Sequence, residues 1–291
     1  MSQFKYISPK TKEEVLQILK QEKSEACLVA GCSNVLPYIK DKIISKKLLL
    51  DISGIEELNY IKESEGEIYI GAGTTISDLI NSKIIREECN ILYQAAEQFA
   101  DPTIRNSATI GGNLADASPA ADMAPPLLVL DAVLEVESMD GKREISLKNF
   151  FIGPRKTVLH DDEMITSIKI KDDSINKNGC FIKLGLRQAM AISLATVALI
   201  LEVEKDKVAD VRIAMGSIAP TPLRLIKVEG FLKNKEINDE LIEEAIKKVR
   251  EEVKPIGDVR ASAEYRRYVS GILFKRAFSQ LTDSPIHQLT N

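Results

Sequence analysis

The segment from Asp101 to Pro126 is the feature that most constrains how this chain can fold. It is rich in small residues, asparagine and proline and has almost no bulky side chain, so it cannot form a hydrophobic core of its own. Glycine lacks a Cβ and tolerates positive φ, which lets backbone approach another group closely. The stretch 109–113 (TIGGN) can therefore present several N–H groups in one turn, a good host for phosphate oxygens. The alternative is a tight turn between two elements.

A second glycine-bearing loop lies earlier in the chain, at residues 30–34 (AGCSN). The apolar run Cys27–Ala30 is too short for a helix and predicts a buried strand, with a short helix beginning near Asn34. N–H groups and the dipole at a helix start favour an anion. Taken alone, this loop fits an ordinary capped strand-to-helix turn better than a ligand site. Two such loops in one domain favour a ligand with two linked phosphates.

Composition argues against several classes of function. The net charge is -4 and no Lys/Arg block occurs, so we expect no nucleic-acid partner. No apolar run approaches the ~20 residues that span a bilayer, and no signal-peptide pattern begins the chain, so we expect a cytoplasmic protein without a membrane partner. The only two histidines and four scattered cysteines give no metal-ligand spacing. We therefore expect no metal ligand and no catalytic side chain here, and a reactive group supplied by a cofactor.

The order of elements predicts two parts. Strands and helices alternate in the N-terminal half, where we expect a helix over 87–99 and a strand over 127–136. A glycine-containing turn at 71–73 lacks the third glycine of a Rossmann fingerprint. The charged, polar stretch 171–179 marks a domain boundary.

The glycine loops also carry a resemblance to a known family. Residues 109–122 (TIGGNLADASPAAD), continuing to Pro126, resemble the second FAD motif of the molybdenum-hydroxylase flavoproteins. These are the medium subunits of the xanthine dehydrogenase and carbon monoxide dehydrogenase type. Residues 28–36 (LVAGCSNVL) resemble their first motif. Motif order, spacing and length resemble a free-standing medium subunit over essentially the whole chain.

The resemblance implies an α+β fold with a vanillyl-alcohol-oxidase-type (PCMH-type) FAD-binding domain. This domain would cover 1–175, as two α/β subdomains at about 1–57 and 58–175. A smaller α+β domain of the carbon monoxide dehydrogenase flavoprotein C-terminal type would follow at 176–291. The residues expected to contact FAD are Val29, Ala30, Gly31, Cys32, Ser33, Asn34, Val35, Leu36, Phe99, Thr109, Ile110, Gly111, Gly112, Asn113, Ser118, Asp122, Ile165, Phe181 and Lys183.

Five of these residues lie outside the glycine loops. By resemblance, Phe99 packs on the cofactor, Asp122 accepts hydroxyls of its polar chain, and Ile165 offers a backbone contact to the flavin. Phe181 lies near the isoalloxazine and Lys183 reaches its polar edge, where positive charge stabilises the reduced anionic flavin. From the sequence alone, Phe99 is equally a helix core residue. The alternative for Asp122 is a loop cap.

Two residues depart from the family pattern. Cys32 stands where many relatives have a second glycine; it is either a thiol with a lowered pKa or a small buried filler. Asp116 puts a carboxylate near the expected pyrophosphate, which is unfavourable unless it points to solvent.

The implied function is an electron-transfer subunit. Its FAD would take electrons from the [2Fe–2S] clusters of a small partner subunit, beside a large molybdopterin subunit, and pass them to an acceptor such as NAD. The alternative is a stand-alone FAD-dependent oxidase or dehydrogenase of the same fold.

Overall fold

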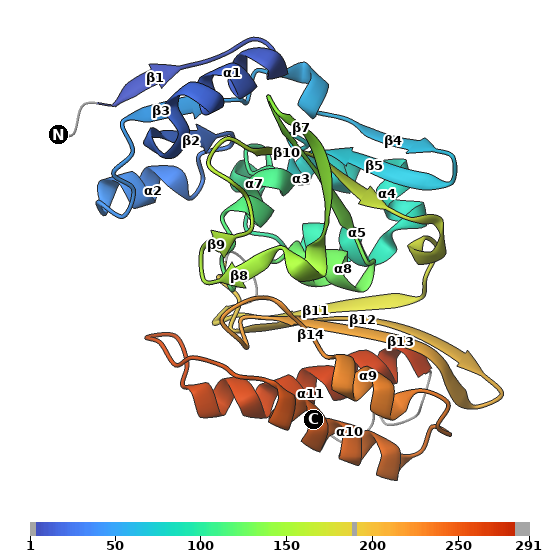
Figure 1. Ribbon diagram of the computed structural model, residues 1–291. Helices are drawn as coiled ribbons and strands as arrows, with labels where there is room; N and C mark the ends of the chain where they lie inside the picture. The colour runs from blue at the N-terminus through green and yellow to red at the C-terminus, as the bar shows by residue number, and fades with distance from the viewer. Residues whose placement is uncertain (1–3, 188–190, 283–291) are drawn as a thin grey trace.

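The computed structural model describes residues 4–187 and 191–282. The three main sheets follow one another along the chain. In Figure 1, the first two sheets and their helices form the upper part of the molecule, and the third sheet with the C-terminal helices forms a layer below them. Among the described residues, no helix is both long and apolar enough to cross a bilayer.

The N-terminal sheet is parallel, in the order β1 (Lys5–Ile7), β3 (Leu48–Asp51), β2 (Ala26–Val29). Helix α1 (Lys12–Glu22) connects β1 to β2, and α2 (Val35–Lys40) follows β2. The Thr11 hydroxyl caps α1 by accepting from the Glu14 N–H, as its position before the helix predicts. Buried Val15, Leu16 and Leu19 pack α1 onto the sheet.

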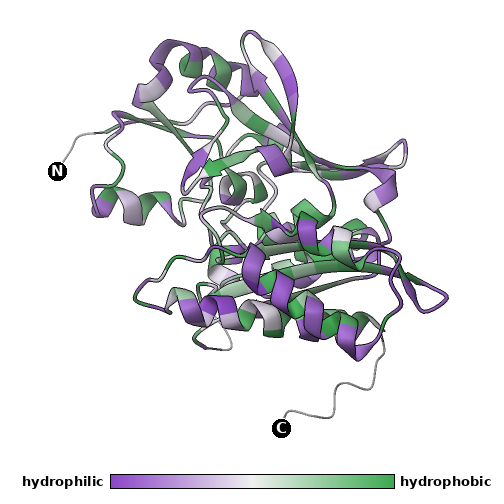
Figure 2. Cartoon of the chain, turned by 60° about the horizontal axis from the view of Figure 1, so that its bottom comes forward, coloured by the Kyte–Doolittle hydropathy of each residue, from purple (hydrophilic) through white to green (hydrophobic). Residues whose placement is uncertain are grey.

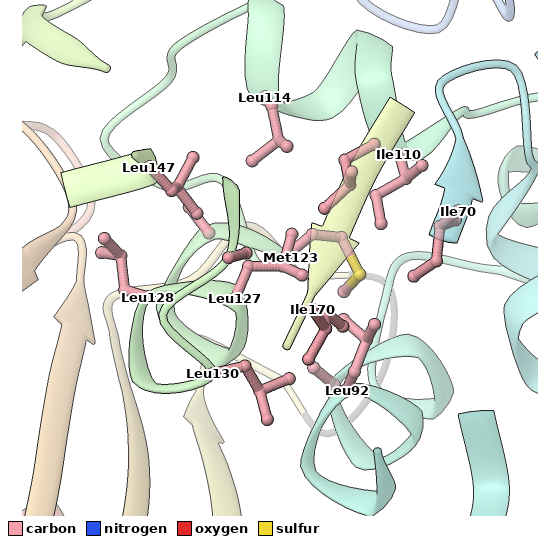
Figure 3. Packing of buried hydrophobic residues seen from close by; sticks show 14 of the residues in the cluster. Ile70, Leu92, Ile110, Leu114, Met123, Leu127, Leu128, Leu130, Leu147 and Ile170 are labelled. Atoms are coloured by element: carbon pink, nitrogen blue, oxygen red, sulfur yellow. The ribbon is translucent and has the colours of Figure 1, made fainter. Parts of the chain in front are cut away.

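The second sheet is antiparallel and holds five strands in the order β4-β5-β10-β6-β7. Their bounds are β4 Ile61–Ser64, β5 Glu67–Gly71, β10 Met164–Ile170, β6 Val133–Ser138 and β7 Gly141–Ser146. Its associated helices are α3 Ile76–Asn81, α4 Lys83–Glu88, α5 Asn90–Glu97, α6 Pro102–Arg105, α7 Ile110–Ala115 and α8 Ala124–Val129. A hairpin of β8 (Phe151–Gly153) and β9 (Lys156–Thr157) precedes β10. Figure 3 shows Met123 and Leu127 packed among the side chains of this core.

Three details differ from the sequence predictions. The helix expected over 87–99 is two helices, α4 and α5, which meet at buried Cys89. The strand expected over 127–136 begins only at Val133, because Leu127–Val129 end α8. The stretch 109–113, expected as a turn, is instead the start of α7, and the segment 101–126 also forms α6 and the start of α8.

The C-terminal sheet is antiparallel, in the order β11 (Gly179–Leu184), β12 (Ala195–Glu204), β13 (Lys207–Gly216), β14 (Leu223–Arg224). Helices α9 (Ile226–Leu232), α10 (Asp239–Glu252) and α11 (Ala263–Thr282) cover one face, and α8 and α5 lie against the other. Figure 2 shows hydrophilic residues on the outer faces of these helices.

The position of strand β12 between two hydrophobic cores explains why the middle of its sequence is apolar on both faces. Ala198 and Ile200 belong to the core of the second sheet, whereas Val197 and Leu199 belong to the core under α10 and α11. Both faces of the strand are buried from Val197 to Leu201, so the side chains over this stretch are all apolar. The two cores share this sheet as a common wall.

Candidate functional site

A cavity of about 1340 Å³ runs between the glycine loops and the C-terminal sheet. This exceeds the roughly 300–1,000 Å³ of an ordinary ligand pocket and suits an extended cofactor. The expected contact residues that line it are Ala30, Gly31, Cys32, Ser33, Asn34, Val35, Phe99, Thr109, Gly112, Asn113, Ser118, Asp122 and Lys183. The structure therefore brings both loops and the Asp122 and Lys183 side chains to one space.

The first loop lies directly against the second. A Cβ on Gly31 would come within 1.8 Å of the Ser107 carbonyl oxygen, so only glycine allows this approach. Cys32 follows with φ 54°, a left-handed conformation that explains why glycine suits this position. Among the described residues, the N–H groups of Ser33 and Asn34 have no protein acceptor. These donors are available to a ligand.

The second loop is built differently from the expected open nest. It is the start of α7, where the Thr109 hydroxyl accepts from the Gly112 N–H (3.1 Å). The N–H groups of Ile110 and Gly111 donate to the carbonyls of Thr74 and Ala72, both at 3.0 Å. Gly111 is needed for packing, because its Cβ would lie 2.6 Å from that of Ala72. Most backbone donors here are already used within the protein.

Six of the expected contact residues do not line the cavity: Val29, Leu36, Ile110, Gly111, Ile165 and Phe181. Phe181 is buried in the core of the second sheet, and Leu36 is exposed on α2. Their contact with FAD stays a prediction.

A buried ion pair forms part of the cavity wall. Lys183 Nζ lies 2.6 Å from Asp122 Oδ2, and each side chain is 9% exposed. Lys183 also donates to the Gln98 carbonyl (3.1 Å), and the Ser193 hydroxyl donates to the other Asp122 oxygen. Burial raises the pKa of Asp122, while Lys183 and Ser193 act in the opposite direction. The lysine charge at this wall is thus partnered by a carboxylate.

Asp116 bridges the two loops. Its Oδ2 accepts from Asn34 Nδ2 at 2.9 Å and lies 3.4 Å from the Tyr38 hydroxyl. The Arg155 guanidinium stacks on the Tyr38 ring, 3.9 Å from its centroid. The carboxylate that departs from the family pattern is therefore held in place by two neutral donors.

Cys32 is not an activated thiol. Burial, then the nearby Asp51 carboxylate, raises its pKa, which favours the filler interpretation over a lowered pKa. All four cysteines are free. No group of residues in 4–187 and 191–282 is arranged to hold a metal ion.

The cavity also has a wall that the sequence did not predict. It comes from the loop before α11, with Ile256, Asp258 and Arg260, and from Arg266 on α11 itself. Arg266 is 2% exposed and donates to the carbonyls of Leu194 and Ser217 and to Asp258. Arg266 lies among charged and polar neighbours, Glu264 and Arg267, as a surface residue would, so no local signal marked it.

These residues fit a dinucleotide flavin. The cavity offers free N–H groups at Ser33 and Asn34, next to Gly31, whose missing Cβ lets the first loop pack against Ser107. The Asp122–Lys183 pair and the C-terminal wall line the same cavity and provide polar groups for a ring system.

Comparison with known proteins agrees with this fit. Residues 2–170 match the FAD binding domain in molybdopterin dehydrogenase, and residues 181–281 match the CO dehydrogenase flavoprotein C-terminal domain. The chain is 30% identical to the glyceraldehyde dehydrogenase medium chain of Sulfolobus acidocaldarius, over 96% of this chain and 98% of the relative. It is 31% identical to the carbon monoxide dehydrogenase medium chain of Hydrogenophaga pseudoflava, over 95% of this chain and 96% of the relative.

A solved structure of carbon monoxide dehydrogenase from Hydrogenophaga pseudoflava has the same fold, with a TM-score of 0.93 and 30% identity over 97% of this chain and 98% of that one. The likeness confirms the expected fold class, a vanillyl-alcohol-oxidase-type FAD-binding domain with a carbon monoxide dehydrogenase flavoprotein C-terminal domain. The chain belongs to the FAD-binding medium subunits of the molybdenum-containing hydroxylases, oxidoreductase subunits whose cofactor is FAD.

Proposed function

We propose that this chain is the electron-transfer subunit of a molybdenum-containing hydroxylase or dehydrogenase. FAD bound in the cavity would accept electrons from the [2Fe–2S] clusters of a small partner subunit and release them to an acceptor such as NAD. A large molybdopterin subunit would oxidise the substrate. The observation that carries the proposal is the cavity shared by both glycine loops and the C-terminal wall, in a chain similar to medium subunits over nearly its whole length.

The chain's own residues would bind and orient the cofactor. The proposed contacts are those named from the sequence, with the loop of 30–34 and the hydroxyls of Thr109 and Ser118 at the diphosphate. Asp122 and Lys183 would face the flavin as a pair, so the flavin would meet a dipole and not an isolated positive charge. We further propose that residues 1–175 hold the cofactor and 176–291 close over it.

The partners and location are part of the same proposal. Curated relatives carry names such as "Carbon monoxide dehydrogenase medium chain" and "Xanthine dehydrogenase FAD-binding subunit", which supports a multi-subunit complex for this chain too. We propose that the complex acts in the cytoplasm, without a membrane or nucleic-acid partner.

Recovery of the native complex tests the proposal. A tagged chain purified from its own cells should bring two further proteins together with iron, molybdenum and FAD, each measured directly. Reduced flavin in that complex should regain its visible absorbance when NAD⁺ is added; another acceptor would replace NAD in the scheme. A chain recovered alone that oxidises an organic donor would instead support a stand-alone flavin oxidase.

A further inference from the structure

We propose that Arg155 binds the phosphates of the cofactor, with Tyr38 as the residue that positions its guanidinium. The inference rests on the proposed function, because it concerns FAD bound in the same cavity. Neither residue was among the contacts expected from the sequence.

Arg155 is fixed at the cavity by two different contacts. Its backbone N–H donates to the Ala117 carbonyl (2.9 Å), which ties the β8–β9 hairpin to the end of α7. Its guanidinium lies 3.9 Å from the centre of the Tyr38 ring, a cation–π contact. Both side chains belong to residues that line the cavity. The long arginine side chain is thereby held in one place before a ligand arrives.

The hydrogen-bonding capacity of this guanidinium is unused. Across residues 4–187 and 191–282, no protein acceptor bonds to its five N–H donors, and no carboxylate forms an ion pair with it; its ring contact is with Tyr38. Other cations of the wall are engaged: Lys183 by Asp122, Arg260 by Asp258 and Arg266 by two carbonyls and Asp258. Arg155 therefore retains the planar fork of donors that matches phosphate oxygens.

The Asp116 carboxylate lies beside the first glycine loop, where we expect the diphosphate of FAD to bind. Asp116 lies 2.9 Å from Asn34, within the first loop, and both of its side-chain partners there are neutral. A diphosphate placed beside the free N–H groups of Ser33 and Asn34 would meet this carboxylate as a like charge. Tyr38 joins the two groups, with its hydroxyl toward Asp116 and its ring under Arg155. Arg155 thus stands where positive charge offsets both anions.

Titration of the full-length chain with FAD tests this assignment. Unbound FAD is separated by ultrafiltration and measured by absorbance, at about 0.05 and about 0.5 M salt. We expect Arg155→Gln to raise the Kd about ten-fold at low salt, the effect of losing a charge-assisted hydrogen bond. The difference from wild type should shrink at high salt, because an exposed ionic contact is screened. Arg155→Lys should recover part of the affinity. Tyr38→Leu, which removes the ring that holds the guanidinium, should raise the Kd less than Arg155→Gln does, and the Tyr38→Leu/Arg155→Gln double variant should bind no more weakly than Arg155→Gln alone.

Arg86→Gln is the matched control. Arg86 also stacks on a tyrosine, Tyr93, at 5.1 Å, but neither residue lines the cavity; its Kd should equal that of wild type. A Kd for Arg155→Gln within two-fold of wild type would overturn the assignment, as would a loss that salt does not reduce. Failure of the wild-type chain to bind FAD would instead contradict the proposed function.

Discussion

At the scale of single residues, the Asp122–Lys183 pair sets the electrostatics of the cavity wall. A lysine free of partners would favour added electrons on the flavin strongly, but here its charge is largely offset by a carboxylate 2.6 Å away. The pair is also costly to disturb, because removing one member leaves a buried unpaired charge.

We expect Lys183→Met to lower the free energy of unfolding of the flavin-free protein by about 3–5 kcal/mol. The cause is Asp122, which would remain buried and, among the described residues, would keep the Ser193 hydroxyl as its side-chain hydrogen-bond partner. The double variant Lys183→Met/Asp122→Asn removes that charge and keeps an acceptor for Ser193, so it should recover most of the loss. Urea denaturation followed by circular dichroism measures both. Equal stability of the single and double variants would contradict an uncompensated charge as the cause.

The sequence singled out Asp122 and Lys183 separately, through the family resemblance. It could not pair them, because they lie 61 positions apart and meet only when β11 packs beside the end of the second motif. Arg155 and Arg266 were missed for a related reason: an arginine carries no local pattern that distinguishes a cavity wall from solvent.

At the scale of elements, the loop between β2 and α2 depends on contact with the segment before α7. The Gly31 backbone touches the carbonyl of Ser107, which is backbone and cannot yield like a flexible side chain. Close approach of the two loops therefore requires glycine at this position.

Gly31→Ala should lower the free energy of unfolding by about 1–3 kcal/mol through overpacking, and it should weaken FAD binding by displacing the first loop. Gly54→Ala is the control, because a Cβ there meets nothing within 4 Å; its stability should change by less than about 0.5 kcal/mol. Thermal unfolding with and without FAD compares the two variants. A stable Gly31→Ala protein with wild-type FAD affinity would show that the loops can separate without consequence.

Strand β7 and the turn before β10 are joined by an ion pair that predicts a pH effect. Arg143 donates to both oxygens of Glu163, at 2.7 and 2.8 Å, and this contact lowers the carboxyl pKa below its usual 4.5. A carboxyl group whose pKa is lower in the folded state stabilises the protein at pH values above its unfolded-state pKa. This stabilisation is lost as the pH falls through the folded-state pKa.

Wild type should therefore be more stable than Arg143→Gln above pH 4.5, and the two should converge as acid protonates Glu163. Urea denaturation at a series of pH values between about 6 and about 3 measures this. A difference that stays constant over the whole range would mean that Arg143 acts through its bond to the Val158 carbonyl instead.

Element prediction succeeded where local signals are strong. The apolar run at 27–30 falls on strand β2, Ala26–Val29, and the short helix expected near Asn34 begins at Val35 as α2. It failed at 127–129, where Leu127, Leu128 and Val129 are apolar because α8 is buried on all sides, and not because they form a strand.

At the scale of the whole molecule, α5 joins the two cores. Gln94 Oε1 accepts from the Phe181 N–H at 2.9 Å and its Nε2 donates to the Gly179 carbonyl at 3.1 Å. One side chain of the FAD-binding part thus satisfies the backbone of β11 in the C-terminal sheet.

Gln94→Ala should leave the buried Phe181 N–H without a partner, at a cost of about 1–3 kcal/mol. We expect faster hydrogen exchange at β11, resolved by mass spectrometry of peptides from that strand. Gln98→Ala removes one bond to the Phe181 carbonyl and leaves the N–H paired, so its effect should be smaller. If hydrogen exchange at β11 is unchanged in Gln94→Ala, the contact between α5 and β11 is stabilised by apolar packing and not by these hydrogen bonds.

The cavity is lined by residues from both the FAD-binding part and the C-terminal part of the chain, and this has a practical consequence. The polar stretch 171–178 connects β10 to β11, and residues that line the cavity come from both sides of it in the sequence. Cleavage of the chain there would yield two fragments, each carrying part of the FAD-binding site. Mixing them would restore bound flavin only when the fragments reassemble, so the protein could serve as an optical reporter of its own complementation.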